Sequence, residues 1–256
     1  MAVIHPPFPS VPDGLPAGVV VRACDGFTEP RWAGRPILWL TADELPDASG
    51  LWTRLYGERE KTGLYPLLLS GLSGDTTRPW LAEELGFVPV DDVDEVDPGE
   101  ALAELWAEYL EDDGPSGAWP GLAAPGTMAG DPDEEARELA LFLGEKRRVG
   151  LVPVDRGADA LAMSGWDGPC NHTNAIGDLA AVVRSWEDRF GARVVEVGFD
   201  TLNLSVAAPP ATVEHARAVA AEHYAFCPDN IDQSGLGLDA YADALVDTRC
   251  WTFWWD

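Results

Sequence analysis

The residue types best suited to chemistry gather in two short polar segments in the second half of the chain. The first segment, 166–174, reads WDGPCNHTN and places Asn171 and His172 after Trp166. His172 would serve as a general acid or base near neutral pH, with Trp166 and Asn171 as binding residues. The alternative is structural, because Asn and Thr side chains also order turns and cap the helix that follows.

The second polar segment, 223–233, reads HYAFCPDNIDQ and contains Cys227, Asp229 and Asn230. If the two segments meet in the fold, these three residues would share a binding pocket with His172. Asp229 would then be a second candidate for acid–base catalysis. The structural alternative makes Cys227 a small buried hydrophobic residue and places Asp229 and Asn230 in a turn.

A zinc site in the same two segments is not predicted. Cys170, His172, His223 and Cys227 are ligand types that can hold zinc in a tetrahedron. However, the chain has no C-x-x-C pair, in which two residues separate the cysteines. Cys170 and His172 would also point to opposite sides of an extended segment. The glycine motifs of nucleotide binding and the nucleophile elbow of serine hydrolases are also missing from the sequence. We therefore predict no metal ligand and no cofactor.

Charge and composition limit the classes of partner. The formal net charge of −27 opposes sequence-independent binding to nucleic acid and docking on an anionic membrane. It leaves a basic protein partner open, and the alternative is a surface whose charge serves solubility alone. A hydrophobic share of 46% in 256 residues is enough for one large domain or two ordinary ones with a real core. Four scattered cysteines, with neither a signal peptide nor a membrane-length apolar run, predict a soluble cytoplasmic protein.

The elements expected to carry these segments begin with an N-terminal α/β region over 1–110. Strands are predicted over 18–23, 36–41 and 64–69, and Pro66 indicates that the third is an edge strand or contains a bulge. Helices are predicted over 51–62, capped by Asp47 or Ser49, and over 100–110. Residues 111–132 are dense in Gly, Pro and Ala, which predicts a linker or long loop.

The C-terminal region, 133–256, shows clearer periodicity. Helices are predicted over 133–143, 178–190, 212–226 and 238–246, and strands over 150–154, 158–164, 193–199, 202–206 and 251–255. The order from residue 158 is strand, helix, strand, strand, helix, strand. This is the split βαβ, or ferredoxin-like, order, so the fold class is mixed α/β with a ferredoxin-like C-terminal domain.

Several motifs of this region resemble a known family. They are Gly165-Trp166, Asn171-His172-Thr173, the run 184–192 (RSWEDRFGA), 198–202 (GFDTL), 226–230 (FCPDN) and the closing 251–256 (WTFWWD). Together they resemble the domain of unknown function DUF4253, a bacterial family common in actinobacteria, over 149–256. The resemblance implies a family and no activity, because none is established for DUF4253.

Two functional classes follow from these observations. The first is a non-enzymatic interaction protein, for example an immunity-type protein that neutralises a cationic partner by charge complementarity. The second is a small-molecule-binding protein or a hydrolase-like enzyme that uses the 166–174 loop. The sequence favours the first class narrowly, because it carries the large negative charge and none of the usual catalytic signatures.

Overall fold

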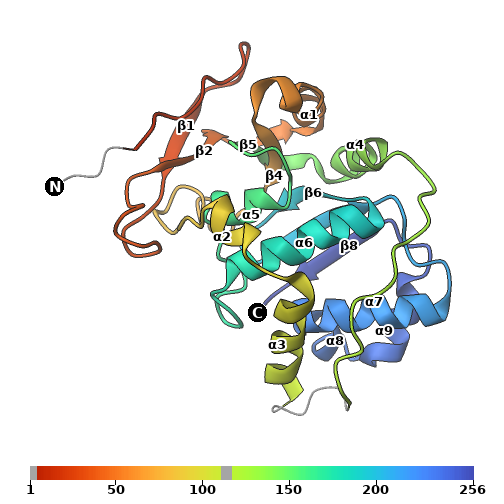
Figure 1. Cartoon of the computed structure of the whole chain (residues 1–256). Helices are drawn as coiled ribbons and strands as arrows, with labels where there is room; N and C mark the ends of the chain where they lie inside the picture. The colour runs from red at the N-terminus through yellow and green to blue at the C-terminus, as the bar shows by residue number, and fades with distance from the viewer. Residues whose placement is uncertain (1–4, 111–116) are drawn as a thin grey trace.

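The computed structural model describes residues 5–110 and 117–256 (Figure 1). Its strands are β1 (Gly18–Arg22), β2 (Pro36–Thr41), β3 (Leu45–Asp47), β4 (Tyr65–Leu69), β5 (Glu145–Val152), β6 (Ala192–Val197), β7 (Thr201–Val206) and β8 (Cys250–Trp254). Its helices are α1 (Ser49–Thr62), α2 (Val90–Asp94), α3 (Pro98–Leu110), α4 (Pro132–Leu143), α5 (Asp159–Met163), α6 (Ile176–Phe190), α7 (Val213–Phe226), α8 (Asp229–Asp232) and α9 (Gly237–Leu245). The predicted mixed α/β class is confirmed.

The strands of the described chain form one mixed sheet in the order β1-β2-β5-β4-β6-β7-β8, with β3 also paired to β5. Strands β4 and β6 run parallel, and the other neighbouring pairs run antiparallel. Helix α6 lies across this sheet, and α7, α8 and α9 form a group beside it (Figure 1). The aromatic core between them includes Trp186, Phe226, Trp251 and Phe253, all buried.

The predicted ferredoxin-like order is not found in this sheet. Residues 158–164, predicted as its first strand, contain helix α5 instead, and every residue of α5 is buried. A short run buried on all sides has no apolar stripe, so periodicity cannot separate strand from helix there. The Ala, Leu and Met side chains of α5 favour the helix. In addition, β4 of the first region lies between β5 and β6.

Strand β4 shows that the two regions share one sheet. Pro66 predicts an edge strand or a bulge, yet β4 pairs with β5 on one side and with β6 on the other. Pairing with β6 involves Leu68 and Leu69, so the missing N–H of Pro66 falls outside that ladder. Regions 1–110 and 133–256 therefore contribute strands to the same sheet.

The most periodic segments form as predicted. Helix α6 buries Leu179, Val182, Val183, Trp186 and Phe190, and it ends at Gly191 in the left-handed conformation. Strands β6 and β7 form the predicted hairpin. The Thr212 side chain accepts a hydrogen bond from the His215 N–H and so caps α7.

The predicted linker is held against the body over the part that the structure describes, because 111–116 lie outside the described residues. Trp119 packs on Trp106 of α3 with ring centroids 5.6 Å apart. The backbone N–H groups of Gly126 and Ala129 donate to carbonyl oxygens of Arg189 and Ala207. Residues 117–131 therefore form a strap over α6 and α7.

One buried carboxylate fixes this strap. The fully buried Glu222 of α7 accepts hydrogen bonds from the Ala123 backbone N–H at 2.6 Å and from Trp186 Nε1 at 2.7 Å. The guanidinium of Arg189 donates to both Glu222 oxygens at 2.7 Å. Both oxygens of this carboxylate are thus occupied, which offsets the cost of burying the charge.

Among the described helices, none is long and apolar enough to cross a membrane.

Candidate functional site

The two polar segments singled out from the sequence meet in the structure. His172, in the loop between α5 and α6, places its Nε2 atom 2.7 Å from Oδ2 of Asp229 at the start of α8. The side chains are 20% and 9% exposed, so solvent reaches the pair only partly. This contact ties the 166–174 loop to the second segment.

Asp229 accepts two further hydrogen bonds. The Asp256 backbone N–H donates to Oδ2 at 2.8 Å, and Gln233 Nε2 donates to Oδ1 at 3.0 Å. Asn171 Nδ2 donates to the Asp256 carbonyl oxygen at 2.7 Å. We call His172, Asp229, Asn171 and Asp256 the loop clamp. Its hydrogen bonds hold the 166–174 loop against the C-terminal residues of the chain.

Cys227 and Asn230 support strand β8 rather than a pocket. The Asn230 side chain donates to the Thr252 carbonyl at 2.7 Å and accepts from the Trp254 N–H at 3.0 Å. It thus pairs with the outer edge of β8 as a neighbouring strand would. Cys227 Sγ donates to the Trp254 carbonyl at 3.0 Å, and burial raises the pKa of this thiol to about 12.

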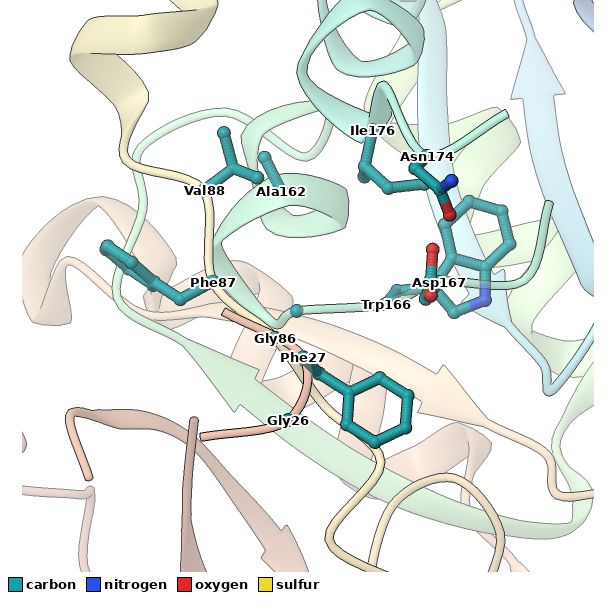
Figure 2. A pocket seen from close by; sticks show the side chains of 11 residues that line it. Gly26, Phe27, Gly86, Phe87, Val88, Ala162, Trp166, Asp167, Asn174 and Ile176 are labelled. Carbon is teal, nitrogen blue, oxygen red and sulfur yellow. The ribbon is translucent and has the colours of Figure 1, made fainter. Parts of the chain in front are cut away.

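The cavity of this region lies on another side of the loop, next to Trp166. It has a volume of about 380 Å³, and Asp167 and Asn174 supply its polar side chains. Figure 2 shows both side chains among those that line the cavity. The remaining wall comes from both regions of the chain and consists of Gly26, Phe27, Gly86, Phe87, Val88, Ala162, Gly165, Trp166 and Ile176.

Glycines allow three chain segments to pack together at the base of this cavity. The Gly86 N–H donates to the Gly165 carbonyl at 2.9 Å. A Cβ atom added at Gly165 would lie 2.1 Å from the Gly86 carbonyl oxygen, and one at Gly86 would lie 2.2 Å from the Phe27 carbonyl oxygen. Gly165 also has a φ of +71°, which favours glycine. No larger residue fits at Gly165 or Gly86 without moving the backbone.

Asp167 is the most unusual group at this cavity. The side chain lacks an ion-pair or hydrogen-bond partner among the described residues, and burial raises the pKa of its carboxyl. Asp167 and Phe27 also line a smaller cavity of about 100 Å³ with Arg78, Pro79, Glu84 and Phe199. The two hollows therefore adjoin at a half-buried carboxylate that forms no ion pair with a described residue, since Arg78 of the smaller hollow pairs with Glu84.

The predicted site residues thus separate into three groups. Trp166 lines the cavity and donates through Nε1 to the Gly198 carbonyl at 2.8 Å. Asn171, His172 and Asp229 form the clamp, whereas Cys227 and Asn230 bind β8. Of the residues that sequence reasoning missed, Asp167 and Asn174 lay within the predicted loop, and their polar side chains were the available signal. Phe27 and Gly86 belong to no motif.

Comparison with known proteins adds a family for part of the chain. The fold and the cavity define a mixed α/β protein with a cleft of small-molecule size. Residues 148–256 match the family model described as Domain of unknown function (DUF4253), which supports the predicted family over that range. No curated protein and no solved structure matches the chain. The matched range contains the 166–174 loop and the whole clamp, whereas Phe27 and Gly86 lie outside it.

The clamp leads to a testable prediction. We expect His172→Ala to lower the free energy of unfolding by about 1–2 kcal/mol, because it removes a partly buried hydrogen bond to a carboxylate. Amide hydrogen exchange should become faster over 167–175. His172→Gln is the matched control, since its amide can still donate to Asp229 and should restore part of the loss. Equal urea midpoints for wild type and both variants would contradict a holding role for the pair.

Proposed function

We propose that the cavity beside the 166–174 loop binds a small organic cation, with the Asp167 carboxylate as its counter-ion. The observation that carries this proposal is the half-buried Asp167, which lines both adjoining hollows without a partner among the described residues. An unpaired carboxylate in a partly desolvated cavity is unfavourable alone and is stabilised by an opposite charge. A ligand that carries an ammonium group would supply that charge.

The surroundings of Asp167 support the same ligand class. Phe27, which is 48% exposed, lines both hollows, and aromatic faces attract cations. Asn174 adds an amide that can accept a hydrogen bond from an ammonium group. The smaller hollow has an apolar wall of Phe27, Pro79 and Phe199, which suits a hydrocarbon or aromatic substituent. The proposed ligand is therefore a primary amine with a short apolar group.

Binding is better supported than hydrolysis at this cavity. Burial and the negative charge of Asp167 raise the pKa of the Cys170 thiol, so the nucleophilic thiolate is disfavoured. His172 directs Nε2 to Asp229 in the clamp. Among the described residues no hydrogen bond joins Cys170 to His172 as a nucleophile–base pair, whereas Asp167 and the aromatic wall need no such pair to bind a cation.

The proposal predicts a loss of affinity in Asp167→Asn. Titration of the full chain with benzylammonium chloride, followed by NMR chemical shifts, should show saturable binding in the wild type. We expect the Asn variant to bind about tenfold more weakly or worse, the equivalent of about 1.4 kcal/mol. Because only the ionised carboxylate attracts the cation, binding should also weaken as the pH falls through the raised pKa of Asp167.

Asp178→Asn is the matched control for this experiment. Burial raises the pKa of Asp178 as well, but its side chain does not line the cavity. The control should bind benzylammonium as the wild type does. The Asp167 variant should also melt no earlier than the wild type, because it removes a carboxylate that burial destabilises. Equal affinity of wild type and Asp167→Asn would refute the proposed role of Asp167.

A basic protein partner is the second candidate function. It is supported by the net charge of −27 and by the exposed acidic residues of α2, α3 and the turn between them, namely Asp91, Asp92, Asp94, Glu95, Asp97, Glu100, Glu104 and Glu108. Such a surface would steer a cationic protein into contact, as in an immunity-type complex. The proposed location is the reducing cytoplasm, where the free cysteines Cys24, Cys170, Cys227 and Cys250 would stay reduced.

A further inference from the structure

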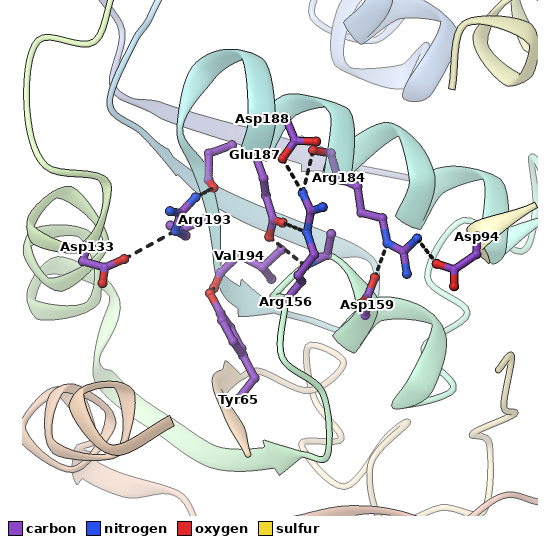
Figure 3. A network of polar contacts seen from close by, with 12 residues as sticks. Tyr65, Asp94, Asp133, Arg156, Asp159, Arg184, Glu187, Asp188, Arg193 and Val194 are labelled. Atoms are coloured by element: carbon purple, nitrogen blue, oxygen red, sulfur yellow. Dashed lines mark hydrogen bonds and ion pairs between the residues drawn. The ribbon is translucent and has the colours of Figure 1, made fainter. Parts of the chain in front are cut away.

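Three arginines converge on a separate cavity of about 230 Å³. They are Arg59 of α1, Arg156 of the loop after β5 and Arg193 of β6. Such a grouping is notable in a chain with 17 basic and 44 acidic residues. Figure 3 shows Arg156 and Arg193 on either side of Glu187, with Tyr65 below them. The cavity therefore gathers positive side chains from three elements that are far apart in the sequence.

The guanidinium groups keep donors that the fold does not use. Arg156 donates from Nε to Glu187 and from Nη2 to Asp188 and the Arg184 carbonyl, which leaves Nη1 without a partner among the described residues. Arg193 donates from Nη1 to the Ala192 carbonyl and weakly from Nε to Asp133. Its Nη2 atom therefore also has no partner among the described residues. Each free nitrogen carries two N–H groups that can bind a ligand oxygen.

The lining balances its three arginines with three carboxylates, so unused N–H donors, rather than a net positive charge, favour an anion in this cavity. Asp133 is shared by two guanidinium groups, with Arg59 Nη2 at 2.7 Å and Arg193 Nε at 3.4 Å. Arg156 contacts two carboxylates, but the Asp188 side chain is 69% exposed and is therefore screened by solvent. Burial raises the pKa of the other carboxyl, Glu187, and its two oxygens are occupied by Arg156 Nε and by the Ala158 backbone N–H. The exposed Asp155 completes the acidic lining.

We infer that this cavity binds a small phosphate-bearing anion, held by Arg156 and Arg193. Guanidinium groups present paired N–H donors whose spacing matches the oxygens of phosphate. The volume of about 230 Å³ is several times the roughly 30 Å³ that one water occupies, so it admits a phosphate with a small organic group. The site shares no lining residue with the cavity at Asp167, and so it stands independently of the proposed amine site.

Calorimetric titration of the full chain with inorganic phosphate at low ionic strength tests this inference. Saturable binding at one site is expected, and sodium acetate should bind at least about tenfold more weakly. Absence of saturable binding up to millimolar phosphate would overturn the inference. Acetate binding as tight as phosphate binding would overturn the assignment to phosphate. Asp167→Asn should bind phosphate normally, which separates this result from any failure of the amine site.

Variants at Arg193 locate the site. Arg193→Gln should weaken phosphate binding about tenfold or more, and Arg193→Lys should weaken it less, because lysine keeps the charge but loses the paired donors. Arg217→Gln is the matched control, since Arg217 is exposed and pairs with Asp239 away from the cavity. Thermal melting verifies that each variant is folded. If Arg193→Gln and Arg217→Gln bind phosphate equally well, the cavity is not the site.

Discussion

Glu222→Ala is expected to lower the free energy of unfolding by about 3–5 kcal/mol, the usual cost of removing one partner from a buried ion pair. Glu222 is fully buried, and its loss would leave the Arg189 guanidinium, which is 13% exposed, without its counter-charge. The Trp186 indole N–H and the Ala123 backbone N–H would lose their acceptor at the same time. Each unsatisfied donor adds to the cost.

Urea unfolding followed by tryptophan fluorescence measures this change. Glu222→Gln should fall between wild type and Glu222→Ala, because its amide oxygen can still accept while the charge is lost. Asp239→Ala is the control: it removes an ion pair whose carboxylate side chain is 87% exposed, and it should leave the midpoint nearly unchanged. A Glu222→Ala midpoint equal to that of the control would show that the strap around Ala123 is not held by this carboxylate.

Gly165→Ala is the second change with a large expected effect, a loss of about 2–5 kcal/mol of unfolding free energy. The φ of +71° costs an L-residue about 1–2 kcal/mol. The added Cβ atom would also lie 2.1 Å from the Gly86 carbonyl oxygen, and relieving such an overlap in a packed region costs about 1–3 kcal/mol more. Because the backbone must move at the base of the cavity, benzylammonium binding should weaken as well.

Two glycine controls separate the causes of the Gly165 effect. Gly34 has a φ of +78° with no atom within 4 Å of an added Cβ, so Gly34→Ala reports backbone strain alone. Gly26, in the wall of the same cavity, also has open space and is not among the glycines with positive φ. The stability loss should therefore increase from Gly26→Ala to Gly34→Ala to Gly165→Ala. A Gly165 loss no greater than that of Gly34 would contradict the close approach to Gly86.

The sequence predicted the position of the candidate site better than it predicted the roles of the residues there. Polar residues between two buried elements marked the 166–174 loop, and the meeting of His172 with Asp229 matches the proximity considered for a shared pocket. Their hydrogen bonds serve the clamp, while Asp167 in the same loop faces the cavity. The sequence could not separate these roles, because the direction of each side chain depends on which segments pack on either side of the loop.

The sequence by itself determined the elements whose apolar residues follow one clear period. Helix α6, its end at Gly191 and the β6–β7 hairpin follow from local patterns that need no knowledge of distant residues. It also determined the net negative charge of the chain, because charge is a sum over residues. Helix α5 escaped prediction because burial on every side removes the stripe on which periodicity depends.

Only the tertiary structure decided the order of the strands and the composition of the cavities. Strand β4 enters between β5 and β6 through pairings with distant segments, and no local pattern records which strand a segment will join. The cavity base needs Phe27, Gly86 and Gly165 together, and the arginine site needs Arg156 and Arg193 together. Residues so far apart in the chain become neighbours through packing, and their shared chemistry exists only in the folded chain.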